Sequence, residues 1–331
     1  MGYSAGDTIL DDEYNTFATG NAAGTGDTSA ASINTIWGTG TGIHGYGQSN
    51  TVAAVSAGSA ITATQWTTLL ARLNSIRQHQ GTSINISTFS VSSGDAIAAI
   101  ANLSADITTL YNASGTEAAS DNITEATGAT DDYTSSWNGT LTMTATVTFA
   151  GGNEARFFFN AGGYIKLNPS LNDATGRNAQ WKHLLDEVGD LKLLGSTFTR
   201  SFSNNTSGYG PGGDNSPTTH ASTTGYYDLT NSSDTSMFKY TVDDAFGYGN
   251  YHANYYEVQM NPGADHADGD GNNGEVITIK QIFADAHTNP QDTSVTGDVD
   301  ATITVGKPNT TQLNNDAIGT VTISTASWAA S

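Results

Sequence analysis

The chain has 331 residues, of which 32 are acidic and 11 are lysine or arginine, so its formal net charge is −21. This charge argues against binding of nucleic-acid phosphates, which requires basic side chains, and against attraction to anionic membranes. The sequence contains no cysteine, which excludes a thiol nucleophile and a thiolate metal site. The length predicts about two domains, and it is sufficient to bury a sizeable core.

The composition favours β-structure. Charged residues make up 13% of the chain, and the remaining polarity comes from threonine, serine and asparagine. Threonine packs well on the pleated surface of a sheet. The first residues have neither a basic nor an apolar segment, so we expect no secretory signal peptide. No stretch is apolar enough to span a bilayer, and we expect no membrane insertion.

The clearest helix is predicted over residues 62–80. Thr62 and Gln65 have the spacing of a capping box, and Ile61 and Trp66 have that of a hydrophobic staple. Gly81 stands where a left-handed residue would end the helix. Apolar residues recur at helical spacing, which predicts one buried face: Trp66, Leu69, Leu70, Leu73 and Ile76.

A second helix is predicted over residues 95–112, with an apolar stripe formed by Ile97, Ile100, Leu103, Ile107, Leu110 and Tyr111. The spacing suits a short bundle between subunits, in which Ile97, Ile100, Ile107 and Tyr111 would form the oligomer interface. The alternative is an ordinary amphipathic helix packed on the core of its own domain. A sustained coiled coil needs three or four heptads, so the short stripe favours this alternative.

A weak internal repeat precedes the second helix. Residues 6–17 align without gaps to residues 58–69, and residues 33–37 resemble residues 73–77. The aligned pairs include Tyr14 with Trp66. We interpret the two copies as a duplicated strand-turn-helix unit, too few to form a solenoid.

The pattern changes to β from Trp137 onward. Residues 140–149 alternate apolar side chains with five threonines, which predicts a strand with one buried face. Helices are predicted over residues 153–163 and 178–188. Further strands are predicted over residues 164–167, 191–194, 197–202, 236–242, 255–260, 276–283, 299–305 and 320–324.

These elements predict a fold that is mainly β, within the α+β class. A helical region over residues 1–135, rich in alanine, glycine, serine and threonine, would serve attachment or oligomerisation. An antiparallel β-sandwich with two inserted helices would follow over residues 136–331.

A glycine-rich segment, Gly40–Gly45, matches the dinucleotide-binding pattern G-x-G-x-x-G. That pattern requires a strand before it and a helix N-terminus after it, aimed at the pyrophosphate. Neither is predicted here, so the segment is interpreted as a flexible or tightly turned loop.

The acidic segment 265–275 is the best candidate for a metal site. Asp268, Asp270 and Asn272 have the alternating spacing of a calcium loop. The sixth position is Asn273 instead of glycine, and the twelfth is Ile279 instead of glutamate. The favoured interpretation is an acidic hairpin connection, with a calcium site as the alternative; no other cofactor is predicted.

No catalytic constellation can be assembled from the sequence. The histidines are scattered, without metal-binding spacing. The neighbouring pairs Asp131/Asp132 and Asp243/Asp244 could serve hydrolysis only if the fold set their carboxylates at a working separation. We therefore expect a protein that is not an enzyme.

Aromatic residues are dense in the segment 246–256. Exposed rings of Tyr248 and Tyr251 could stack on sugar faces, which would make this segment a glycan-binding surface. The alternative is packing in the sandwich or at an interface, where tyrosine keeps its hydroxyl in water. The alternative is favoured, because an aromatic cluster is more often part of the packing.

Six longer segments together form a pattern; they are residues 38–48, 61–81, 136–170, 178–185, 253–261 and 274–289. These segments resemble virion structural proteins of marine cyanophages, the contractile-tailed cyanomyoviruses and their relatives. The resemblance implies a structural component of the virion, often associated with the tail or a fibre, and it carries over no catalytic position.

The expected function is therefore a non-enzymatic virion component in a tail, fibre or other appendage, assembled in the host cytoplasm. Its expected partners are other virion proteins and further copies of itself, with a trimer suggested by the apolar stripe from Ile97 to Tyr111 and by analogy with viral fibres. Two other functions stay open: a lectin-like adhesin that binds host surface glycan, and a capsid decoration or filament subunit.

Overall fold

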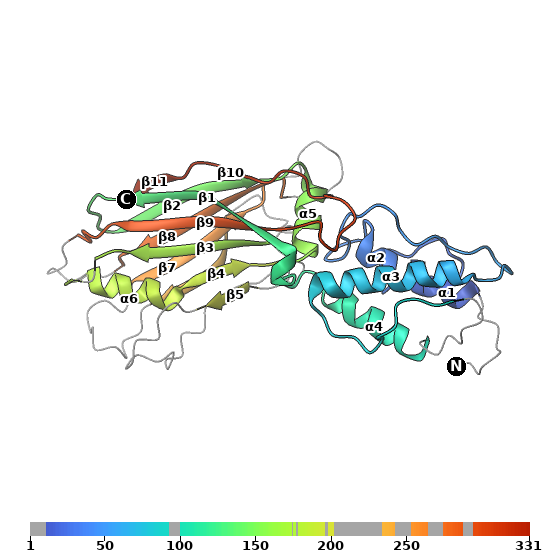
Figure 1. The fold of residues 1–331 in the computed structure, drawn as a ribbon. Coiled ribbons are helices and arrows are strands. Elements are labelled where there is room, and N and C mark those ends of the chain that lie inside the picture. Colours follow the sequence, from blue (N-terminus) through green and yellow to red (C-terminus); the bar gives the residue numbers. More distant parts are fainter. Residues whose placement is uncertain are drawn as a thin grey trace. The chain divides into compact units, whose positions relative to one another are not determined.

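A computed structural model describes residues 11–92, 100–173, 175–176, 178–195, 198–201, 234–241, 253–263, 274–286 and 294–331. The chain forms two compact units (Figure 1). The N-terminal unit consists of Met1–Thr124, Asn153–Gly163 and Lys307–Gly319. The sandwich unit consists of Glu125–Gly152, Tyr164–Gly306 and Thr320–Ser331. The predicted division was a single boundary after residue 135, whereas the N-terminal unit also includes two segments from far along the chain.

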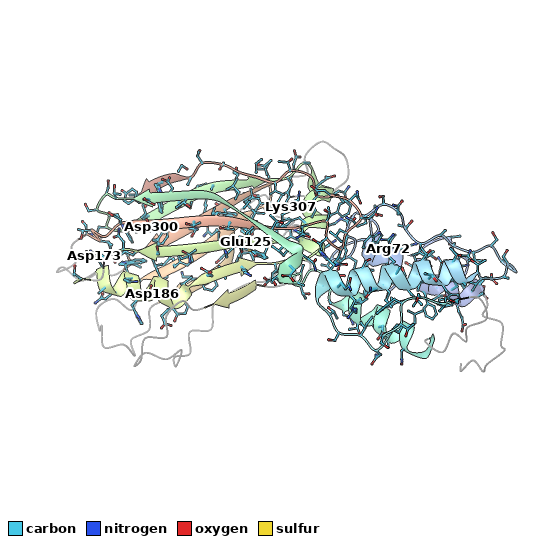
Figure 2. The ribbon with its side chains drawn as sticks, viewed as in Figure 1. Arg72, Glu125, Asp173, Asp186, Asp300 and Lys307 are labelled. Carbon is cyan, nitrogen blue, oxygen red and sulfur yellow. The ribbon has the colours of Figure 1, made fainter. Side chains whose placement is uncertain are left out.

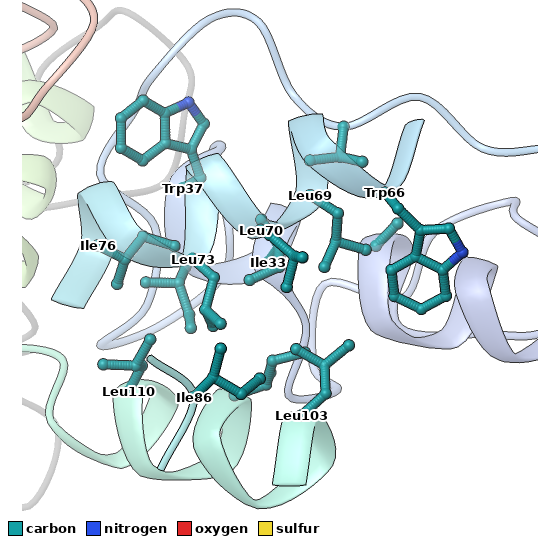
Figure 3. Close-up of a cluster of buried hydrophobic side chains, with 14 of the residues drawn as sticks. Ile33, Trp37, Trp66, Leu69, Leu70, Leu73, Ile76, Ile86, Leu103 and Leu110 are labelled. Atoms are coloured by element: carbon teal, nitrogen blue, oxygen red, sulfur yellow. The ribbon is translucent and has the colours of Figure 1, made fainter. Parts of the chain in front are cut away.

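Helices build the N-terminal unit around one apolar core. They are α1 (Asp11–Thr19), α2 (Ile33–Trp37), α3 (Ala63–Gln80), α4 (Ile100–Asn112) and α5 (Gly152–Asn160). Figure 3 shows α3 with its apolar side chains directed at those of α4 and α2. The five apolar residues predicted for the buried face of α3 are all buried, and Leu103 and Leu110 of α4 pack in the same cluster.

The ends of α3 confirm the prediction from its capping residues. The Thr62 hydroxyl accepts the Gln65 N–H at 3.3 Å, and the Thr62 N–H donates to the Gln65 side chain at 2.7 Å. Gly81 has a φ of 70° and ends the helix in the left-handed conformation. Each bond satisfies a backbone or side-chain group that the helix itself leaves free, so the helix begins and ends where local chemistry dictates.

The repeat has a counterpart in the packing. Residues 11–17 of α1 align with residues 63–69 of α3, so both aligned segments are helical. The aligned rings of Tyr14 and Trp66 contact each other edge to face, with 5.5 Å between centroids. Residues 57–61 form a turn and irregular chain before α3, so the predicted strand is not found in the second copy.

The sandwich unit consists of two antiparallel sheets, which confirms the predicted fold class. One sheet has the order β1 (Ile123–Tyr133), β9 (Val299–Pro308), β3 (Tyr164–Leu171), β4 (Asp190–Leu193) and β5 (Phe198–Ser201). The other has the order β10 (Thr322–Ile323), β2 (Thr140–Thr148), β8 (Val276–Ala284), β7 (Tyr255–Asn261) and β6 (Thr235–Thr241). Strand β11 (Ser327–Ala330) also pairs with β2.

Strand β2 follows the predicted alternation. Leu141, Met143, Ala145 and Val147 are buried, and the threonines between them lie on the outer face. Helix α6 (Asn178–Val188) packs within this unit: its Trp181 ring lies 4.9 Å from Trp137, between centroids. Of the two helices predicted as insertions into the sandwich, only α6 belongs to it, because α5 packs in the N-terminal unit.

Candidate functional site: a clamped glycine-rich loop

The glycine-rich loop, residues 38–48, follows α2 in the N-terminal unit. The Tyr46 N–H donates to the Ile36 carbonyl and the Gln48 N–H to the Trp37 carbonyl, both at 2.9 Å. These bonds fold the loop back onto α2. A helix therefore precedes the loop, where dinucleotide binding would require a strand.

Two glycines in the loop are required by its geometry. Gly45 has a φ of 102°, and a Cβ atom there would collide with the Thr39 carbonyl oxygen. Gly47 has a φ of 66°, and a Cβ atom there would collide with the ring of Phe157. Both positions combine a left-handed backbone with close contact, so any other residue would strain the loop.

Helix α5 clamps the loop through two buried side chains, Arg156 and Asn160. The Arg156 guanidinium donates to the carbonyl oxygens of His44 at 2.9 Å and Thr39 at 2.8 Å. The Asn160 amide donates to the carbonyl oxygens of His44 at 2.9 Å and Gly45 at 3.2 Å. The loop thus presents carbonyl oxygens to internal donors, whereas a phosphate cradle presents N–H groups to a ligand.

His44 and Tyr111 join the loop to α4. Their rings are stacked with centroids 3.5 Å apart, and the Tyr111 hydroxyl donates to the Ser29 carbonyl at 3.0 Å. Burial lowers the pKa of His44 to about 4, so the imidazole is neutral at neutral pH. The Nδ1 atom of His44 is buried and has no hydrogen-bond partner among the described residues.

His79 lies at the C-terminal end of α3 and is fully buried. Its Nε2 atom lies 2.8 Å from the Ala161 carbonyl, so the neutral ring carries its proton on Nε2 and donates. Burial lowers the pKa of His79 to about 4, and the hydrogen bond to Ala161 opposes this shift only in part. The neutral ring therefore fixes the end of α3 to the residues that follow α5.

Acid is expected to destabilise the N-terminal unit through His79. Its pKa of about 4 in the folded state lies below the ordinary value of 6.5, so the unfolded chain binds the proton more tightly. The contribution of neutral His79 to the free energy of unfolding is complete above about pH 6.5. It is lost as the pH falls, by about 2 kcal/mol at pH 5 and about 3 kcal/mol at pH 4. Denaturant titrations from pH 7 to pH 4 measure this loss.

The matched control for this titration is His79→Gln, which can keep a donor toward Ala161 and removes the ionisation. Its unfolding free energy should depend less on pH, by the amounts given above. The carboxylates contribute equally to the pH dependence of the wild type and of His79→Gln. If the unfolding free energy of both proteins falls equally between pH 6.5 and pH 4, His79 is not the group responsible.

Asp106 is the buried carboxylate of α4. Its two oxygens accept the Asn85 N–H, the Asn85 side-chain amide and the Ile86 N–H at 2.8 to 2.9 Å. The N–H donors compensate the cost of removing a charge from water. Asp106 therefore fixes the chain after α3 against α4.

A second candidate is a pair of carboxyl groups on the sandwich unit. Asp132 of β1 and Asp300 of β9 share a side-chain hydrogen bond; Asp300 is labelled in Figure 2. Burial raises the pKa of Asp300, and Asp132 raises it further. Asp132 was singled out in the sequence with Asp131, but its partner was missed because no strand was predicted over β1. Asp243 and Asp244 lie outside the described residues.

Two open depressions lie on the N-terminal unit. One, of about 580 Å³, follows α3 and is lined mainly by threonine, serine and alanine, with Arg72 at its side. Arg72 lies 4.0 Å above the Trp37 ring and donates to the Asn50 carbonyl. The other, of about 350 Å³, includes Asp27, whose pKa is lowered by hydrogen bonds from Ser29. Neither brings a nucleophile and a base together among the described residues.

The structure describes part of the predicted interface. Ile107 is buried in the core of the N-terminal unit, and Tyr111 is stacked on His44. Both are therefore engaged within their own unit, as in the alternative interpretation of the stripe. Ile97 lies outside the described residues, and only the backbone of Ile100, in α4, is described.

The candidate glycan residues Tyr248 and Tyr251, and the candidate calcium ligands Asp268, Asp270 and Asn272, also lie outside the described residues. In the part of the chain that is described, no group of three histidine or acidic side chains could hold a metal ion. None of the described helices is both long and apolar enough to cross a membrane.

These features define an α+β protein with a helical unit, assembled from three chain segments, and a two-sheet antiparallel sandwich unit. No family model, curated protein or solved structure matches the chain.

Proposed function

We propose that this protein is a non-enzymatic structural component of a phage virion, located in a tail, fibre or other appendage, and that it associates with copies of itself and with other virion proteins. One observation carries the proposal: buried polar side chains of the N-terminal unit bind the backbone of that same unit. Arg156 and Asn160 bind the glycine-rich loop, and Asp106 binds the chain after α3.

This use of buried charge is compatible with a scaffold. A buried guanidinium or carboxylate costs free energy unless hydrogen bonds compensate it, and here backbone groups supply those bonds. The result is irregular chain held in one conformation without regular sheet or helix. Such loops can present a fixed surface to a neighbouring subunit.

The sequence adds two independent supports. Lysine and arginine total 11 residues, which suits a chain with large buried interfaces, where lysine is depleted. Both units contain sequence segments that resemble virion structural proteins of marine cyanophages. These segments include α3, the glycine-rich loop, β2 and β8.

The alternative functions differ from this proposal only in the partner surface. A lectin-like adhesin would depend on Tyr248 and Tyr251, and no observation among the described residues favours it. A capsid decoration protein or a filament subunit would need the same fold, so the position in the particle separates these functions.

Purified particles of a phage that encodes this chain should contain it. We expect mass spectrometry to detect the protein in gradient-purified virions, and antibodies against it to label the tail or its appendages in electron micrographs. Labelling of the capsid would instead favour a decoration protein. Absence from particles, with the protein present in the infected cell, would contradict the proposal.

A further inference from the structure

The last strand of the chain, β11, leaves one backbone edge unpaired. Residues Ser327–Ala330 pair with β2 on one side, in a register that sets Ala329 opposite Thr142 and Trp328 opposite Met143. No other strand pairs with β11 among the described residues. The edge is therefore open to another strand.

The register decides which backbone groups point outward. Thr140 and Ser331 exchange both of their N–H and carbonyl bonds, at 2.9 Å each. Because hydrogen-bonded pairs alternate along an antiparallel ladder, Ala329 and Ser327 also face β2 with their backbone groups. The N–H and carbonyl groups of Trp328 and Ala330 consequently point away from the sheet.

The outward backbone groups of Trp328 and Ala330 can pair with those of the same strand in a second copy of the chain. In an antiparallel pair of two β11 strands, Trp328 of one copy lies opposite Ala330 of the other, and both outward residues of each strand are used. Ala329 then lies opposite Ala329 of the second copy at a non-hydrogen-bonded position, where Cα atoms approach to about 4.5 Å. Ala329 is exposed, and its small side chain permits this approach.

Charge distinguishes this edge from the others. Strand β1 carries Glu125, Asp131 and Asp132, while β5 carries Arg200 and β6 carries Lys239. Charged side chains on edge strands prevent pairing with another sheet. Residues 320–331 contain neither a charged residue nor a proline. Two copies of a chain with a net charge of −21 repel each other, so an uncharged edge is where they can approach.

We propose that β11 pairs antiparallel with β11 of a second copy of this chain, extending the sheet that contains β2 across a twofold axis at Ala329. The proposal rests on the self-association included in the proposed function. It specifies an isologous contact, in which the same strand serves both copies.

A charge exchange at Ala329 tests the contact. In the full chain, A329K and A329E each place like charges opposite each other across the axis. Each variant alone should raise the dimer dissociation constant at least tenfold in sedimentation velocity, and an equimolar mixture should restore the wild-type value. The matched control is Thr142→Lys, on the same face one strand further from the edge, which should leave the dissociation constant within about threefold of wild type. Thermal unfolding followed by circular dichroism verifies that each variant is folded.

Three outcomes would overturn the assignment: a monomeric wild type at all concentrations, single variants that dimerise normally, or a mixture that fails to recover. An oligomer that survives both charge variants would leave the proposed function intact and reject only β11 as its interface. The presence of the protein in purified particles tests the proposed function separately.

Discussion

A fragment of residues 1–124 is expected to lack the fixed packing of the N-terminal unit, although it contains α1 to α4. The core that these helices form is completed by residues from two other segments, 153–163 and 307–319. Ala161 and Leu313 belong to the apolar cluster, and Ala161 accepts the hydrogen bond from His79. The Gln48 side chain also accepts the N–H groups of Asn314 and Asn315, at 2.8 and 2.9 Å.

The loss should be large because several contacts disappear together. Without α5, the carbonyl groups that Arg156 and Asn160 bind return to water or remain unpaired. Apolar surface around Ala161 and Leu313 is exposed at the same time. A small domain has a stability of about 5–15 kcal/mol, so the sum of such losses can remove it.

Near-ultraviolet circular dichroism of Trp37 and Trp66 measures the packing directly, since both indoles are buried in this core. The control is a chain in which residues 1–124, 153–163 and 307–319 are joined by flexible glycine-serine linkers. We expect a fixed spectrum and a cooperative melt for the linked chain only. A cooperative melt of the simple fragment would show that the two added segments are dispensable.

The substitution Arg156→Ala is expected to destabilise the N-terminal unit by about 3 kcal/mol and to release the glycine-rich loop. Arg156 is 6% exposed, and its guanidinium binds the carbonyl groups of Thr39 and His44. Removing it leaves a cavity and deprives the Thr39 carbonyl of this donor, each costing about 1–3 kcal/mol. Asn160 still binds His44, which limits the effect.

Hydrogen exchange at the amides of Tyr46, Gly47 and Gln48 reports on the loop, because these groups donate to backbone carbonyls. Their protection should fall in Arg156→Ala, together with the midpoint of denaturant unfolding. Arg77→Ala is the matched control: its half-buried guanidinium binds the Asn74 side chain and lies 5.3 Å from the Phe89 ring but holds no carbonyl of the loop, and its loss should cost about 1 kcal/mol without changing the exchange of the loop amides. Unchanged protection of the three amides in Arg156→Ala would contradict the clamp.

The sequence singled out the glycine-rich loop but not the residues that hold it. A helix was predicted over residues 153–163, yet Arg156 and Asn160 received no role. Their spacing of four residues places them on one face of that helix, which is the signal that could have indicated a polar clamp. Their partners lie more than a hundred positions earlier in the chain, so only the fold reveals the contact.

Local chemistry fixed the elements that the sequence predicted well. The capping box at Thr62, the left-handed Gly81 and the alternation along β2 each depend on residues within a few positions of one another. These patterns can be recognised from neighbouring residues alone, and the structure confirms them, although β2 also needs its pairing with β8 and β11.

Only the tertiary structure decided the rest, because those elements are stabilised by distant partners. Strand β1 has no apolar alternation, and it forms because β9 supplies its hydrogen bonds. Strand β3 was predicted to end at Leu167 but continues through Pro169, which is tolerated because β4 pairs no further than Leu167 and leaves no acceptor for an N–H there. The division into units also depends on distant partners. Residues 153–163 and 307–319 belong to the N-terminal unit because their buried side chains, such as Ala161 and Leu313, complete its core.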